Sequence, residues 1–295
     1  MGIQIQSLGY VVIEMQDPAI WLDVGVNVLG FTGQQDSNGT VKLKMDGAPF
    51  RYLVQPGETD RFVCAGWQCS SDEYDALLVA LAEAGINYQE GSSEDCAIRQ
   101  VNAFVSGVDP SGNSFEVFHG RDVDAAFNSP LQGCGFVADD LGMGHLVLPA
   151  LEHAATSDFY QNILGFGMSD DLTLPPPMAE MPEMNIHFLH AANPRHHSLG
   201  LFNGPAPSGV VHLMAEYTTL DQVGACLDRV NQAGLPITAT LGRHANDNMV
   251  SFYFLAPAGI PIEIGFDGAQ FNWDEFEATQ STIGDFWGHE YNFPE

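Results

Sequence analysis

Basic residues are scarce in this chain of 295 residues, in which only 9 lysines and arginines accompany 38 aspartates and glutamates. The formal net charge is −29 at pH 7. A surface with this charge repels a phosphate backbone, so nucleic acid is not an expected partner. The acidity bears on solubility more than on function.

Cysteine is also rare, with five residues and no Cys-x-x-Cys pair. An odd count without close pairs argues against a disulfide framework and against a thiolate zinc site. Long apolar runs are missing too, and the first residues do not combine a basic segment with an apolar one. We therefore expect no membrane span, no export signal and no lipid anchor, and we expect a cytoplasmic location.

The residues that are present describe a packed protein. Hydrophobic residues make up 45% of the chain and charged residues 16%, which distinguishes it from an acidic disordered chain. At roughly 100–200 residues per domain, the length predicts two domains, each with a core of its own.

The two halves of the sequence repeat each other, and such a repeat defines the architecture. A strand-like run beginning at Gly9 is followed by a helical pattern that ends at Gly30, and a run beginning at Gly144 leads to a pattern that ends at Gly165. Both points are shifted by the same number of residues. We expect the glycines at the two ends to terminate their helices.

A second unit follows in each half. Ser70 and Thr219 are predicted N-caps of further helices, and each half closes with a turn into a strand that carries one glutamate. Short runs rich in Val, Phe, Tyr and Ile between the helices are typical of antiparallel strands. The sequence thus predicts four βαβ-like units, two per domain, with the junction near residues 125–140.

Two segments break the repeat. The segment 174–184 contains three consecutive prolines and is predicted to be a surface loop or lid of the second domain. The aromatic and acidic tail, residues 271–295, has no counterpart in the first half. We expect this tail to pack back on the domain surface.

Equivalent positions in the two halves differ in their chemistry. Two histidines and a glutamate in the second half correspond to a tyrosine, a valine and a glutamate in the first. The matched pairs are His145 and Tyr10, His212 and Val63, and Glu263 and Glu116. Two imidazoles and one carboxylate from separate strands are typical of a non-heme Fe(II) site with open coordination positions. The alternative is three unrelated residues, and Glu116 keeps a structural role open for Glu263.

Two further histidines are adjacent in the second half. On a strand, His196 and His197 would point to opposite faces, so at most one of them would face the metal. His197 is the better candidate for acid/base work, to which an imidazole that titrates near neutrality is suited. We expect His196 to be a surface residue or to lie behind the ligands.

The most specific signal is a spacing near the end of the second half. Gly242-x-His244, then Tyr253, Ala256-Pro257-x-Gly259 and Glu263 together resemble the signature of the type I extradiol ring-cleaving dioxygenases of the vicinal oxygen chelate superfamily. The resemblance covers nearly the whole chain, because the Gly-x-Gly-His, His-His-Ser and His-Leu-Met segments occur in the family's order. Within the family, the chain is similar to the two-domain enzymes that act on 2,3-dihydroxybiphenyl, trihydroxybiphenyl, 1,2-dihydroxynaphthalene or catecholic steroid intermediates.

This resemblance implies an α+β fold of four βαβββ modules, with a degenerate domain at residues 1–130 that lacks a metal site and a catalytic, metal-binding domain at residues 135–295. It further implies a non-heme Fe(II) cofactor, O₂ as co-substrate, a catechol as substrate and a homo-oligomeric assembly. Mn(II) stays open, because it accepts the same ligand set.

The resemblance also assigns roles to single residues. It implies His145, His212 and Glu263 as metal ligands, His197 as the acid/base, and two hydrogen-bonding groups at the substrate, His244 and Tyr253. Asn246 and Asp247 match a substrate-binding pair of the family, although as turn-forming residues they are equally suited to shaping the loop.

Two other classes of function use the same scaffold. One is a metal-free protein that binds a small molecule, and the other is a different metal-dependent reaction, such as that of an isomerase or a lyase. The intact set of two histidines and a glutamate argues against the first, and the spacing from Gly242 to Glu263 argues against the second.

Overall fold

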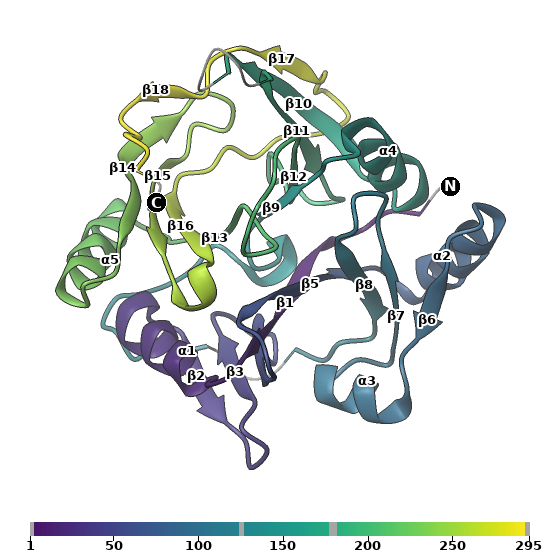
Figure 1. Ribbon diagram of the computed structural model, residues 1–295, viewed down its shortest axis with the longest axis horizontal. Coiled ribbons are helices and arrows are strands. Elements are labelled where there is room, and N and C mark those ends of the chain that lie inside the picture. The colour runs from purple at the N-terminus through teal and green to yellow at the C-terminus, as the bar shows by residue number, and fades with distance from the viewer. Residues whose placement is uncertain (1–2, 124–126, 177–181, 293–295) are drawn as a thin grey trace.

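The computed structural model describes residues 3–123, 127–176 and 182–292. Within these residues the chain forms two strongly curved sheets, each flanked by helices (Figure 1). The first sheet has eight strands in the order β2-β3-β4-β1-β5-β8-β7-β6. The second has ten, in the order β17-β10-β11-β12-β9-β13-β16-β15-β14-β18.

The first half contains, in chain order, β1 (Ser7–Met15), α1 (Ala19–Asp23), the π-helix η1 (Val24–Leu29), β2 (Thr32–Gln35), β3 (Val41–Lys44), β4 (Tyr52–Pro56), β5 (Arg61–Gln68), α2 (Ser71–Glu83), β6 (Tyr88–Glu90), α3 (Ser93–Arg99), β7 (Ala103–Val108) and β8 (Ser114–His119).

The second half contains the 3-10 helix η2 (Asp139–Leu141), β9 (Leu146–Pro149), α4 (His153–Asp158), the π-helix η3 (Phe159–Ile163), β10 (Gly167–Leu174), β11 (Met184–His190), β12 (Leu199–Phe202), β13 (His212–Glu216), α5 (Leu220–Gln232), β14 (Ile237–His244), β15 (Val250–Leu255), the 3-10 helix η4 (Pro257–Gly259), β16 (Pro261–Phe266), β17 (Thr279–Ser281) and β18 (Asp285–Trp287).

This element order confirms the predicted α+β fold of four βαβββ modules, two for each sheet, within the described residues. In each half the two modules join through their first strands, since β1 pairs antiparallel with β5 and β9 with β13. The predicted helix ends are confirmed too, because Gly30 and Gly165 both adopt the left-handed conformation at which a helix stops. Ser70 forms the expected capping box with Glu73 at the start of α2.

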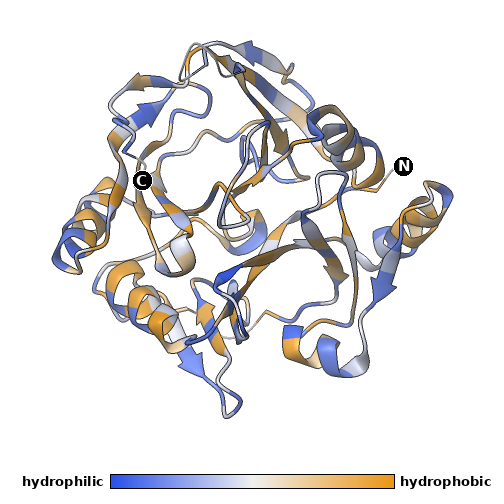
Figure 2. Ribbon diagram, viewed as in Figure 1, coloured by the Kyte–Doolittle hydropathy of each residue, from blue (hydrophilic) through white to orange (hydrophobic). Residues whose placement is uncertain are grey.

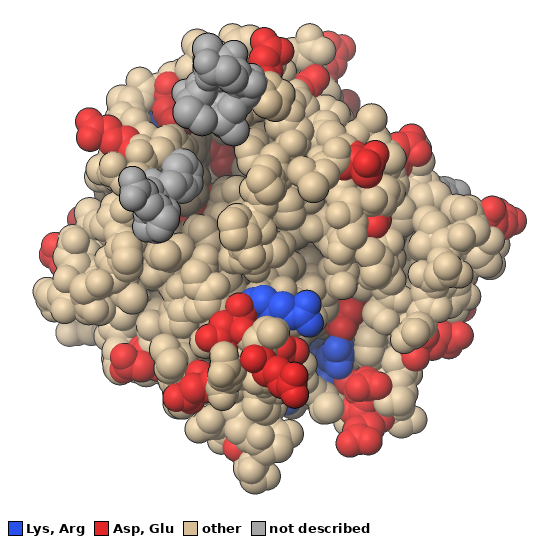
Figure 3. All heavy atoms as spheres, in the orientation of Figure 1, with Lys and Arg blue, Asp and Glu red and all other residues tan. Residues whose placement is uncertain are grey.

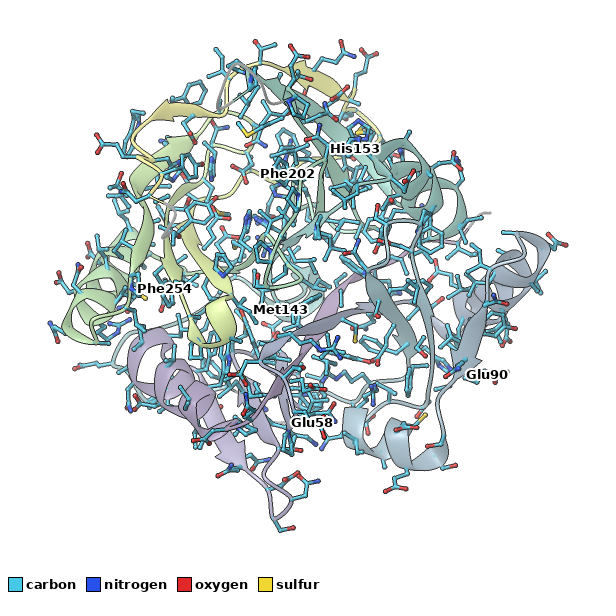
Figure 4. The ribbon with its side chains drawn as sticks, viewed as in Figure 1. Glu58, Glu90, Met143, His153, Phe202 and Phe254 are labelled. Atoms are coloured by element: carbon cyan, nitrogen blue, oxygen red, sulfur yellow. The ribbon has the colours of Figure 1, made fainter. Side chains whose placement is uncertain are left out.

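Strand alternation decides which residues reach the interior of the second sheet. Along β15 and β16 the residues that face the helix side join the main hydrophobic core, and their neighbours in sequence face the opposite way. Phe254 is one of the core residues and lies beside α5 (Figure 4). The alternation therefore leaves Tyr253 and Glu263 on the inner, concave face.

The two halves pack together through their helices. Helix α5 lies against η1, and α2 lies against η3, while one continuous hydrophobic core runs through both halves. Polar contacts reinforce this junction, because Tyr217 donates a hydrogen bond to the carbonyl of Leu29 and Arg229 donates one to Val28, both at 2.7 Å. Helix α5 carries both hydrophobic and hydrophilic residues along its length (Figure 2).

Of the two segments that break the repeat, only the tail differs from its predicted form. The proline-rich segment 174–184 connects β10 and β11 as the end of a hairpin, and its residues 177–181 lie outside the described part of the chain. The tail does not simply lie on the surface. It adds β17 to one edge of the second sheet and β18 to the other.

Three further features bear on location and surface. Among the described helices, none has the length and apolarity required to cross a membrane. All five cysteines lie in described residues and are free. Acidic side chains are spread over the visible face, with few basic ones between them (Figure 3).

Candidate metal centre

Three side chains converge on the concave face of the second sheet. His145 directly precedes β9, His212 begins β13, and Glu263 lies on β16. The Nε2 atom of His145 lies 3.2 Å from Nε2 of His212 and 3.0 Å from Oε2 of Glu263. Their donor atoms all lie within 4.8 Å of one another, so the prediction that these strands bring the three residues together holds.

The protonation of this group suits a metal ion. Burial lowers the pKa of His145 to about 4, so its ring is neutral at pH 7. Burial alone would raise the pKa of Glu263, but hydrogen bonds from His145, His212 and His244 bring it well below its usual range. Two imidazoles and one buried carboxylate are donors that Fe(II) accepts, and a cation would offset the charge of that carboxylate.

His197 lies against this group. Its ring centroid is 4.0 Å from that of His145 and 4.6 Å from that of Phe188. Burial lowers the pKa of His197 well below its ordinary value, and His145 and His196 lower it further. The ring is therefore a neutral proton acceptor. We expected its pKa to lie near neutrality, and it lies lower.

The prediction for His196 was wrong in one respect. Residues 195–198 form a loop before β12 and not a strand, so the two adjacent imidazoles need not point to opposite faces. His196 is buried, and its Nδ1 atom lies 3.0 Å from Nδ1 of His197. Because one of these nitrogens must donate to the other, His196 restricts the tautomer of its neighbour.

His244 and Tyr253 meet on the other side of Glu263. The Nε2 atom of His244 lies 2.8 Å from the hydroxyl of Tyr253 and 3.1 Å from Oε1 of Glu263. Burial raises the pKa of Tyr253 well above its ordinary value, so its phenol stays protonated. Both groups thus offer hydrogen bonds beside the three clustered donor atoms.

Asn246 and Asp247 form the turn between β14 and β15. Asn246 Oδ1 accepts from the backbone N–H of Asp247, and Asp247 Oδ1 accepts from that of Met249. The second oxygen of Asp247 lies 4.0 Å from Nδ1 of His197. The pair therefore shapes the loop and also brings a carboxylate toward the candidate acid/base.

Sequence reasoning missed two residues of the site. They are Asp285 and His289. Asp285 accepts a hydrogen bond from Nδ1 of His244 and another from Nδ1 of His289. Burial alone would raise the pKa of Asp285, but these two bonds lower it to about 2. The segment from 285 to 289 has no copy in the first half, so the comparison of the two halves could not reveal it.

The strand register of the first half identifies the residue that corresponds to His212. Glu116 pairs with Gly66 as Glu263 pairs with Met214, so the residue that matches His212 is Cys64 and not Val63. The expected match was one residue off, and a slip of one along a strand exchanges its two faces.

In the first half, a guanidinium occupies the position that would neutralise the glutamate. Arg99 donates to both oxygens of Glu116, with Nε at 2.6 Å from Oε2, and the Tyr10 hydroxyl donates to Oε2 as well. Aromatic and aliphatic side chains pack around this pair and fill the concave face, namely Val12, Phe50, Leu53, Val101, Phe104 and Phe118. Arg99 comes from α3, a helix that the sequence analysis did not predict.

A curved sheet of βαβββ modules with two histidines and a glutamate on its concave face defines a metalloenzyme scaffold with open coordination positions. Residues 142–264 match the Glyoxalase/Bleomycin resistance protein/Dioxygenase superfamily, and residues 8–57 match the first domain of dihydroxybiphenyl dioxygenase BphC.

Relatives align over the full length. An iron-dependent extradiol dioxygenase of Rhodococcus jostii (strain RHA1) is 38% identical, with 98% of each chain covered. A 2,2',3-trihydroxybiphenyl dioxygenase of Sphingomonas paucimobilis is 31% identical, with 99% of each covered. Among solved structures, a catechol 2,3-dioxygenase has a TM-score of 0.91 at 28% identity, with 99% of this chain and 97% of that chain covered. The chain therefore belongs to the type I extradiol ring-cleaving dioxygenases, iron-dependent enzymes of the vicinal oxygen chelate superfamily.

Proposed function

We propose that this chain opens the ring of a bicyclic or biaryl catechol beside its two hydroxyls, using O₂ and an Fe(II) ion held by His145, His212 and Glu263. The convergence of these three donors on one concave face is the observation that carries the proposal. Similar proteins named for trihydroxybiphenyl, biphenyl-2,3-diol and 1,2-dihydroxynaphthalene support the two-ring substrate class.

The metal supplies one part of this chemistry. When bound, Fe(II) would hold the diol and O₂ in adjacent positions and lower the pKa of the diol, so that electron density can move from the catecholate toward oxygen. Mn(II) fits the same donors, so the metal content of the protein needs to be measured.

In the proposed mechanism, His197 moves the proton. Its neutral ring accepts a proton from the substrate side of the site and returns it later in the reaction. His196 restricts the tautomer of His197 through their nitrogens, and the carboxylate of Asp247 is placed to steady the protonated ring. Asn246 contributes by holding the turn that carries Asp247.

On the opposite side, His244 and Tyr253 orient the diol. A hydroxyl of the substrate placed beside Glu263 would meet the Nε2 atom of His244 and the Tyr253 phenol, which lie 2.8 Å apart. Such fixed hydrogen bonds hold the reacting ring in one pose and reduce the entropy that the reaction must overcome.

The same proposal covers the rest of the molecule. Residues 1–130 serve as a scaffold domain without a metal, and residues 135–295 form the catalytic domain. The filled concave face around Arg99 and Glu116 supports this division of roles. The free cysteines suit a cytoplasmic enzyme, and we propose a homo-oligomer on the strength of the family resemblance.

A panel of catechols tests the proposal. The protein is loaded with Fe(II) without oxygen, mixed with monocyclic and bicyclic catechols, and followed by O₂ consumption and by the colour of the ring-opened product. We expect uptake of O₂ with catechols and faster turnover with the two-ring members. A loaded protein that consumes no O₂ with any catechol would contradict the proposed activity, and a preference for single-ring catechols would contradict the substrate class.

A further inference from the structure

The C-terminal tail joins the two edges of the second sheet. β17 runs parallel to β10, and β18 runs antiparallel to β14, with only three residues between the two tail strands. Thr279 and Ser281 both donate hydrogen bonds to one oxygen of the buried Asp170, at 2.6 and 2.8 Å. The tail is therefore fastened at β10 before it reaches the metal centre.

Two polar side chains of the tail, those of Asp285 on β18 and of His289 just after it, lie close to His244. Oδ1 of Asp285 lies 2.8 Å from Nδ1 of His244 and 2.6 Å from Nδ1 of His289. The His289 side chain is fully buried, and its other nitrogen lies 3.0 Å from the backbone carbonyl of Ser251. A carbonyl can only accept, so His289 donates there and is fixed at both of its nitrogens.

Two glycines make this close approach possible. A Cβ atom on Gly242 would lie 2.5 Å from the ring of His289, so any other residue would displace that ring. Gly288 has φ +77°, and a Cβ there would lie 2.2 Å from the carbonyl oxygen of Leu241. The glycine of the Gly242-x-His244 pattern thus has a physical role, which is to admit the tail.

We propose that Asp285 and His289 are positioning residues for the reaction, and that they hold His244 with its Nε2 atom toward Tyr253 and the substrate. Asp285 accepts a hydrogen bond from Nδ1 of His244, so Nε2 is the nitrogen that faces the substrate. His289 holds Asp285 in place through a second hydrogen bond. This inference rests on the proposed function, in which His244 contacts a hydroxyl of the catechol.

A second metal site is the competing explanation, because the donor atoms of His244, Asp285 and His289 also lie within 4.8 Å of one another. The two nitrogen-to-oxygen distances, however, are those of charge-assisted hydrogen bonds. Hydrogen bonding therefore accounts for the arrangement, and the metal content of variants separates the two explanations.

The test compares Asp285→Ala, Asp285→Asn and a matched control, Glu290→Gln, which changes an exposed carboxylate in the same tail. We expect Asp285→Ala to lower kcat about tenfold or more while the iron content and the unfolding temperature stay close to those of the wild type. Asp285→Asn keeps one acceptor oxygen and is expected to recover part of the loss. Glu290→Gln should behave as the wild type.

A spectroscopic measurement follows the orientation of His244 directly. In zinc-substituted protein, which is diamagnetic, nitrogen-15 NMR should find a proton on Nδ1 of His244 in the wild type and in Glu290→Gln. In Asp285→Ala we expect this proton to be lost from Nδ1, because the carboxylate that accepts its hydrogen bond is gone. A purely structural role of the tail would leave the tautomer unchanged.

Three outcomes would overturn the inference. One is an Asp285→Ala protein with the kcat and the His244 tautomer of the wild type. Another is a loss of one of two bound metal ions on substitution, which would indicate a second metal site. The third, should the alanine variant fail to fold, is the kcat of the wild type in both Asp285→Asn and His289→Gln. A wild-type protein without O₂ uptake would contradict the proposed function, whereas the NMR result would still decide on the positioning of His244.

Discussion

Glu263 and Glu116 occupy equivalent strand positions in the two halves, yet different partners neutralise them. Glu263 faces two imidazoles whose donor atoms suit a metal ion, whereas Glu116 is bound by the guanidinium of Arg99. A carboxylate buried at this depth requires a positive partner in either case. The identity of that partner separates a metal centre from a structural ion pair.

The ion pair of the first half predicts a stability effect. In Glu116→Gln the Arg99 guanidinium loses its counter-charge while it remains mostly buried, which should lower the free energy of unfolding by about 3 kcal/mol. Urea unfolding measures this change. Iron content should not change, and a fall in iron content in this variant would show that the first half also takes part in metal binding.

The candidate acid/base makes a separate prediction. His197→Ala should keep its metal, because the three ligands are untouched, and should lower kcat by about 10²- to 10⁴-fold. Steady-state O₂ uptake together with iron analysis checks both parts. Unchanged turnover at every pH would remove the acid/base role from His197.

At the scale of single elements, the alternation of side chains along a strand separates residues of the core from residues of the site. Phe252 and Phe254 of β15 enter the core beside α5, while Tyr253 between them faces the metal centre. The same strand therefore carries stability on one face and chemistry on the other.

Two substitutions on β15 should separate these effects. Phe254→Ala is expected to lower the free energy of unfolding by about 3–5 kcal/mol through the cavity it leaves, without altering the iron content. Tyr253→Phe should keep the stability and slow turnover, since it removes only the hydroxyl. Thermal unfolding and kcat measured on both proteins check the contrast, and a reversed pattern would show that the two faces are wrongly assigned.

Local signals were sufficient for the elements that recur. The cap at Ser70 and the helix stops at Gly30 and Gly165 are decided by nearby residues, and each was found in the sequence. By contrast, β17 and β18 are short and pair with strands far away in the chain, so no alternation marks them.

The same limit applied to the candidate site. Its histidines stood out because the first half lacks them, and the match of His212 to Val63 failed by one residue because sequence alone does not give strand register. Arg99 and Asp285 were missed because their partners, Glu116 and His244, are made neighbours by the fold and not by sequence. Helix α3 did carry a signal, since Ser92 and Asp95 form a capping box at its start.

At the scale of the whole molecule, one duplicated fold supports two states of the same concave face. In the first half aromatic side chains and an ion pair fill that face, and in the second the histidines, Glu263 and the tail occupy it. The halves share a continuous core through α5 and η1, so the filled half contributes stability to the half that holds the candidate metal centre. The net charge of −29 is distributed over the surface and does not define the site.

We propose that ring cleavage requires a single iron ion held by two histidines and a glutamate of the second half. The most direct test is the iron content of the Fe(II)-loaded wild type and of His212→Ala, measured on the same preparations that are tested for O₂ uptake with a catechol. We expect about one iron per chain in the wild type and very little in the variant, with O₂ uptake lost in parallel. Retention of both iron and O₂ uptake by His212→Ala would contradict this proposal.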